Sequence, residues 1–166
     1  MDPIAPRYTE GPLPSRRFLP GRGPHPSLDP AHREPVAPDV PWRDLAKTHL
    51  FRLGVDLFNH GYFWEAHEAW EALWIAAPKE SALREAVQGL IQLSAALLKE
   101  VVSIPDGARR LSKTSCDRLE RARSREAEVP LDLERVVREA RAHFAPLDDA
   151  KAPEAPRPIL RIATDP

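Results

Sequence analysis

The sequence predicts an all-α protein, a bundle of about five helices, and two observations support this prediction. Of the 19 prolines in 166 residues, only Pro78, Pro105 and Pro130 lie between residues 42 and 145. Proline is disfavoured in helix interiors, so the middle of the chain can be helical while both ends are extended or turn-rich. Apolar residues in the middle recur every three to four positions, and no convincing alternation indicates a strand.

The first predicted helix covers about residues 42–59, and its apolar side contains Leu45, Leu50, Leu53, Leu57 and Phe58. It ends at Asn59-His60-Gly61, because a glycine often takes the left-handed conformation that follows a helix. The second predicted helix covers about 62–76 and stops before Pro78. Its apolar face contains Phe63, Ala66, Trp70 and Leu73.

The third predicted helix covers about 79–103, beginning near Lys79 or Ser81 and ending before the Pro105-Asp106-Gly107 sequence. A fourth helix is predicted at about 106–125, and a fifth, after Pro130, at about 131–144. Short connections between helices of this length favour a bundle.

Three regions follow from the proline distribution: a strap or leader at 1–41, a helical bundle at 42–147 and a tail at 148–166. Disordered leaders are poor in large apolar residues, but this one contains Tyr8, Leu13, Phe18, Leu19 and Leu28. We therefore interpret residues 13–35 as a proline-stiffened strap over the bundle, with a floppy leader as the alternative. In the tail, only the patch at 159–162 offers apolar anchors.

One segment, residues 53–78, has the spacing of a single tetratricopeptide-like helical hairpin. The positions concerned are Leu53, Gly54, Gly61, Phe63, Ala66, Trp70 and Pro78. Small residues would let the two helices approach closely while aromatic rings fill the gap. No second copy follows, and a solenoid needs about three repeats, so a peptide-binding array is not inferred.

Length and composition exclude several classes of protein. A chain of 166 residues suggests one domain, and 24 Lys and Arg against 25 Asp and Glu remove the usual argument for a dedicated nucleic-acid or membrane binder. No apolar stretch has the roughly 18 residues of a membrane span, and the N-terminal residues do not resemble a secretory signal. The single cysteine, Cys116, cannot form an internal disulfide, which favours a cytoplasmic location.

The second predicted helix carries the densest group of chemically active side chains. Beside its apolar face, one imidazole and two carboxylates lie between two indoles: Trp64, His67, Glu68, Glu71 and Trp74. His67 and Glu71, four residues apart, could chelate one divalent metal ion, and Glu68 could act as a catalytic base or further ligand. The HExxE pattern differs from the HExxH zinc motif in its last residue. A buried hydrogen-bond network is therefore favoured over a metal site. A solvent-exposed row of salt bridges is the third interpretation.

Partners for such a network occur on the third predicted helix. Gln88 and Gln92 interrupt an apolar run, and buried amides need hydrogen bonds. Gly89 would let the second and third helices approach closely, and Asn59 belongs to the same predicted polar group. In the alternative interpretation, both glutamines face water.

The strap offers further candidate metal ligands. His25, Asp29 and His32 lie within eight residues among prolines and could complete a site over His67 and Glu71. In the alternative interpretation, Asp29 caps a turn and the histidines are solvated.

The other histidines and the cysteine carry no such pattern. His49, His60 and His143 are expected on helix surfaces or in turns. Cys116 is expected to be a small helical residue rather than a nucleophile, because no basic pocket with a paired histidine is identifiable.

The fourth predicted helix is strongly basic, with seven basic residues against two acidic ones between Arg109 and Arg125. A basic helix could contact phosphates, but this one lacks the interleaved aromatic residues that stack on bases. A solvated face is the favoured interpretation, and binding of nucleic acid is not expected.

The blocks LFNHGYFWEAHEAWEALW and QGLIQLSAALLK resemble the domain of unknown function 309 family, whose members are small, soluble, all-helical proteins of bacteria and archaea. The leader RRFLPGRGPHPSLDPAHRE resembles that of a subset of the family, so the resemblance covers about residues 13–120. It implies a helical bundle with prominent positions at His67, Glu68, Glu71, Trp74 and Gln92. It implies no reaction.

Three classes of function remain after these observations, and whether the protein is an enzyme stays open. The first is a structural or interaction module with a buried His/Glu/Gln network, the favoured class. The second is a metal-dependent hydrolase-like or small-molecule-binding protein, in which a divalent cation activates water, Glu68 accepts the proton and Trp64 and Trp74 line a pocket. The third is a weak binder of nucleic acid or another anionic partner. A homo-oligomer or protein partner is also open, because the sequence does not separate a tryptophan-lined pocket from an interface.

Overall fold

The computed structural model describes residues 5–23 and 42–163. Within these residues the regular secondary structure is helical, and the predicted all-α fold is confirmed. The elements are η3 (Trp42–Lys47), α1 (His49–Asn59), α2 (Phe63–Ala76), α3 (Ala82–Val101), α4 (Pro105–Ser124), α5 (Leu133–Phe144) and η4 (Ala145–Asp149).

Side-chain caps set the beginnings of three helices. Ser81 accepts a hydrogen bond from the Arg84 amide at 3.1 Å at the start of α3, and Asp132 caps α5 in the same way. Thr48 caps α1 and has an extended backbone. The predicted helix over 42–59 is therefore divided at Thr48 into the 3-10 helix η3 and the α-helix α1.

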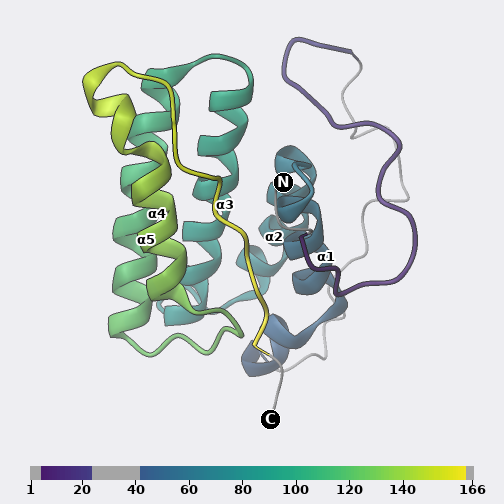
Figure 1. The fold of residues 1–166 in the computed structure, drawn as a ribbon. Helices are drawn as coiled ribbons and strands as arrows, with labels where there is room; N and C mark the ends of the chain where they lie inside the picture. The colour runs from purple at the N-terminus through teal and green to yellow at the C-terminus, as the bar shows by residue number, and fades with distance from the viewer. Residues whose placement is uncertain (1–4, 24–41, 164–166) are drawn as a thin grey trace.

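The helices pack in chain order, each on the next, with α3 between α2 and α4 (Figure 1). Gly89 faces α4: a Cβ atom there would lie 2.7 Å from the Leu119 side chain, and Ser115 donates a hydrogen bond to the Gly89 carbonyl at 2.7 Å. The expectation that Gly89 brings α2 and α3 together is therefore wrong. Its missing side chain makes room for Leu119 instead.

The N-terminal segment, residues 5–23, is held by a carboxylate that lies in the core. Asp56 on α1 is fully buried and accepts hydrogen bonds from the Tyr8 and Thr9 amides, both at 2.8 Å. The Thr9 hydroxyl and Arg7 Nε also donate to it. Further along, the Phe18 amide donates to Glu65 on α2 at 2.7 Å. Two buried acidic groups thus fix the path of this segment.

The C-terminal segment after η4 returns across the bundle to α1 (Figure 1). The Asn59 side-chain amide donates to the Leu160 carbonyl and accepts from the Leu160 amide, both at 2.8 Å. Asn59 therefore holds this segment, and Leu160 becomes fully buried. The Ile162 amide donates to the Tyr8 hydroxyl at 2.9 Å, so the two end segments meet. The division of the chain at residues 41 and 147 stays a prediction.

His143 lies in the core, contrary to the expectation of a surface position, with 3% of the residue exposed. Its Nδ1 is 2.7 Å from the Ala155 carbonyl oxygen and its Nε2 is 2.6 Å from a Glu100 carboxylate oxygen. The other Glu100 oxygen accepts a hydrogen bond from Arg157 at 3.0 Å. The imidazole is buried because the C-terminal segment covers it, and that contact is too distant in sequence to be predicted from helical spacing.

Glu100 makes stability depend on pH. Burial raises the pKa of its carboxyl, but hydrogen bonds and positive charge from His143 and Arg157 outweigh burial, so the pKa lies below the usual 4.5. Because the pKa of Glu100 is lower in the folded state than in the unfolded state, the ionised carboxylate stabilises the fold at pH values above the unfolded-state pKa. This stabilisation is lost as the pH falls through the folded-state pKa. In urea titrations we expect the free energy of unfolding to decrease below about pH 5. The decrease should be smaller in Glu100→Gln and unchanged in a control at an exposed site, Glu128→Gln.

Candidate functional site

Helix α2 is anchored by the predicted apolar face, whose four members, Phe63, Ala66, Trp70 and Leu73, are all buried. With that face turned to the core, the adjoining polar face comes to lie at the edge of the bundle. His67 and Glu68 on this face have 27% and 39% of their side chains exposed. They are thus accessible to a solute without being fully solvated.

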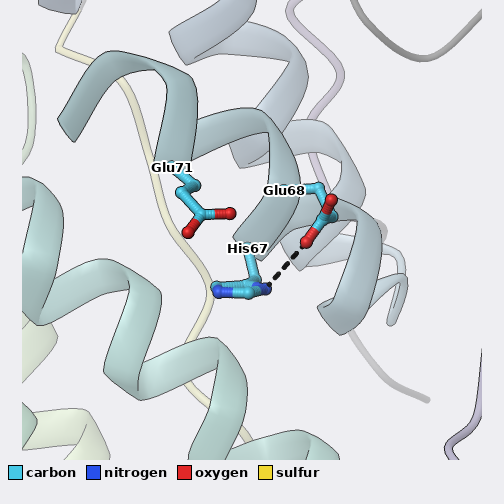
Figure 2. Close-up of side chains that lie close together, drawn as sticks. All are labelled: His67, Glu68 and Glu71. Atoms are coloured by element: carbon cyan, nitrogen blue, oxygen red, sulfur yellow. Dashed lines mark ion pairs between the residues drawn. The ribbon is translucent and has the colours of Figure 1, made fainter. Parts of the chain in front are cut away.

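Three side chains of α2 converge at this edge. His67, Glu68 and Glu71 each offer one nitrogen or oxygen atom, and these atoms all lie within 4.8 Å of one another. Figure 2 shows the two carboxylates on either side of the imidazole, with Glu68 Oε1 at 3.5 Å from His67 Nδ1. At that length the contact is longer than an ordinary hydrogen bond.

Aromatic rings flank the three side chains along α2. The Trp64 ring centroid lies 5.5 Å from the His67 ring in an edge-on arrangement, and Phe18 of the N-terminal segment packs on Trp64 at 4.9 Å. At the other end, the Arg84 guanidinium lies 3.9 Å from the centre of the Trp74 ring. Trp64 therefore lies beside His67, whereas the contact observed for Trp74 is with Arg84.

Other predicted members of the site are placed differently. Gln88 and Gln92 are half-buried on α3, and within the described ranges no hydrogen bond joins either to His67, Glu68 or Glu71. The three strap candidates, His25, Asp29 and His32, lie outside the described residues.

The basic side chains of α4 are largely paired with carboxylates. Arg118 and Arg121 both bind Glu85, at 3.2 and 2.8 Å, and Lys113 binds Asp148 at 2.8 Å. Paired cations release little counterion on meeting phosphates, so this helix is a poor match for a nucleic-acid surface.

A groove of about 350 Å³ runs between α4, α5 and η4, with Cys116 among its lining residues. Burial raises the pKa of the Cys116 thiol to about 11. The thiolate is therefore scarce at neutral pH, in agreement with the expectation that Cys116 is not a nucleophile.

The central segment of the chain matches a known family model. Residues 51–111 match the family model described as Domain of unknown function (DUF309). The resemblance seen in the sequence is confirmed over these residues. The DUF309 segment runs from α1 into α4 and contains His67, Glu68 and Glu71. The function of the DUF309 family is unknown. No curated protein and no solved structure matches the chain. In the described part of the chain, no helix is both long and apolar enough to cross a membrane.

Proposed function

We propose that the protein binds a divalent metal ion on α2, with His67 and Glu71 as ligands. The observation that carries this proposal is the convergence of one imidazole nitrogen and two carboxylate oxygens within 4.8 Å. Metal–ligand bonds of about 2.0–2.2 Å allow two ligands of one ion to lie at most about 4.4 Å apart. Small rotations of these half-exposed side chains would bring the ligand atoms within that distance.

Glu68 has a different role from the two ligands in this proposal. Glu68 follows His67 directly in the chain, whereas Glu71 lies one helical turn beyond His67. Its carboxylate lies 3.5 Å from His67 Nδ1. From that position it can accept a proton from water that a bound cation activates, as in a hydrolase-like reaction. The Trp64 and Trp74 rings favour a small substrate with a ring or aliphatic part.

A purely structural role for the cluster has less support. The predicted network would join α2 to the glutamines of α3, and no hydrogen bond between them occurs among the described residues. A hydrogen-bonded network would also hold His67 and Glu68 closer than 3.5 Å. For location, we propose the cytoplasm, where a reducing environment suits a lone thiol at Cys116.

The test is metal analysis of protein purified without a metal-binding tag. We expect close to one divalent ion per chain in the native protein, and titration with Zn²⁺ or Mn²⁺ should restore it after chelation. The double variant His67→Ala/Glu71→Ala should lose at least about 100-fold in affinity, because outer-shell changes alone typically cost 10–100-fold. Its circular dichroism should be unchanged, since half-exposed side chains contribute about 0.5 kcal/mol or less.

A matched control replaces the same residue types outside the cluster. His49→Ala/Glu80→Ala alters two exposed side chains and should leave metal content unchanged. If the native protein takes up no metal and the cluster variant melts well below the control, the residues stabilise the bundle and the proposed function is wrong.

A further inference from the structure

The C-terminal segment, residues 150–163, meets the bundle at a buried imidazole. His143 on α5 is 3% exposed, and its Nδ1 lies 2.7 Å from the carbonyl oxygen of Ala155 in this segment. Its Nε2 lies 2.6 Å from a carboxylate oxygen of Glu100 on α3. One side chain thus connects the segment to the bundle.

Both ring nitrogens of His143 face atoms that accept hydrogen bonds. The Ala155 carbonyl oxygen can only accept, and so can an ionised carboxylate. Glu100 is ionised at neutral pH because, against the effect of burial, its hydrogen bonds and charge contacts with His143 and Arg157 hold its pKa below the usual 4.5. A histidine donates through both nitrogens only as the positively charged imidazolium. The observed contacts are therefore those of the imidazolium.

The neutral imidazole satisfies only one of these two acceptors. Whichever nitrogen keeps its proton, the lone pair of the other nitrogen faces an oxygen atom at 2.6 or 2.7 Å. Because the ring is buried, an oxygen atom that loses its donor there is costly. Loss of one proton therefore weakens the contact between the segment and the bundle.

One further charge belongs to this cluster. Arg157 donates to the second Glu100 oxygen at 3.0 Å, and its guanidinium lies 5.6 Å from the centre of the Phe63 ring on α2. Among the described residues, no charged side chain of α4 or η4 forms an ion pair with His143. Charged side chains of α4, α5 and η4 pair with one another instead: Glu120 with Arg141, Arg123 with Glu134, Lys113 with Asp148 and Arg135 with Glu139.

We propose that His143 is a pH-dependent switch for the C-terminal segment, whose imidazolium form holds residues 150–163 on the bundle and whose neutral form favours their release. The segment crosses the bundle towards α1, where Leu160 is fully buried (Figure 1). Release therefore exposes the apolar surface that Leu160 covers. This switch is separate from the cation site proposed on α2 and does not depend on it.

The sign of the pH dependence follows from the two groups. The imidazolium holds the segment at low pH, and this stabilisation is lost as rising pH removes its proton. Glu100 acts in the opposite direction, because falling pH protonates the carboxylate that accepts from His143. The segment is therefore held most firmly between the titration of Glu100 and that of His143.

The experiment follows the full chain by nuclear magnetic resonance between about pH 5 and 9, which contains the usual titration range of histidine. The ring nitrogen signals of His143 report its protonation. Hydrogen exchange at the Leu160 amide, which donates to Asn59 at 2.8 Å, reports the position of the segment. We expect the protection of this amide, corrected for the intrinsic pH dependence of exchange, to fall about tenfold or more as His143 loses its proton, because a hydrogen bond to a charged group is lost.

Two variants and one control assign the effect to the His143 pair. In His143→Gln, which does not titrate, the Leu160 protection should not change with pH in the histidine range. Glu100→Gln presents an N–H group to the ring, so the neutral imidazole can satisfy both neighbours and the loss of protection at high pH should disappear. His49→Gln replaces an exposed imidazole and should behave as the native chain does.

Three outcomes would overturn the switch. The first is constant Leu160 protection in the native chain while the nitrogen signals show a neutral His143. The second is an imidazole that keeps both protons throughout the range, since the segment is then never released. The third is a loss of protection in Glu100→Gln that follows pH as in the native chain.

Discussion

Replacement of Asp56 by alanine is expected to lower the free energy of unfolding by about 3 kcal/mol, because a hydrogen bond to a charged group contributes about 1.5–3 kcal/mol and Asp56 accepts several. Asp56 has no exposed surface and accepts hydrogen bonds from Tyr8 N, Thr9 N, Thr9 Oγ1 and Arg7 Nε. Alanine leaves two backbone amides, the Thr9 hydroxyl and Arg7 Nε without their acceptor. Urea titration monitored by circular dichroism measures the loss.

The loss has an upper bound, because the N-terminal segment can detach. Once residues 5–11 leave α1, their amides bind water, so the variant loses the docking energy of the segment rather than the sum of four hydrogen bonds. We therefore expect limited proteolysis to cut this segment in Asp56→Ala under conditions in which the native chain is intact.

The control for this prediction is another aspartate, which accepts fewer hydrogen bonds. Asp132 caps α5 through one hydrogen bond, from the Arg135 amide at 2.9 Å. Asp132→Ala should cost about 1 kcal/mol and leave the N-terminal segment protected. Equal losses in the two variants, with the segment protected in both, would show that Asp56 does not hold it.

The order and type of the helices were predictable because their signals are local. Ser81 lies at the cap position of α3, and Gly61 has a φ of 81° at the end of α1, as a helix stop requires. The break at Thr48 was missed because two apolar residues four positions apart, Ala46 and Leu50, lie on either side of it. A cap residue inside a continuous pattern is a weak signal, and here it decided the boundary.

Only the part of the candidate site that lies on a single helix was predictable from the sequence. His67, Glu68 and Glu71 come together because residues on one helical turn are neighbours whatever the rest of the fold does. The partners of Asn59 and His143 could not be predicted in this way. They are Leu160, more than one hundred residues away, and Glu100, on another helix.

Asp56 was missed although the sequence contains a signal for it. It interrupts the apolar run Val55-Asp56-Leu57-Phe58. A carboxylate in such a run either faces solvent on the polar side of the helix or is buried beside hydrogen-bond donors. The donors come from residues 7–9, which helical periodicity does not place.

Gly54→Ala should destabilise the protein by about 3 kcal/mol, the upper part of the usual range for overpacking a core. Gly54 lies in α1, where alanine by itself favours the helix by about 1 kcal/mol. However, its Cβ atom would lie 2.2 Å from Trp70 Nε1, and Trp70 is fully buried. The rigid indole packs on Phe51 and Phe58 and donates a hydrogen bond to the Phe51 carbonyl at 3.3 Å, so it cannot move without disturbing all three contacts.

The same substitution elsewhere isolates this clash from the general effect of alanine. At Gly107 in α4, a Cβ atom would approach the side chain of Ile104 at 3.2 Å, and Ile104 is 44% exposed and free to yield. Gly107→Ala should therefore be neutral or stabilising by up to about 1 kcal/mol. In a Trp70→Leu background, Gly54→Ala should cost much less than in the native chain, since the atoms it meets are gone. Equal costs in both backgrounds would mean that Gly54 is needed for a reason other than the approach of Trp70.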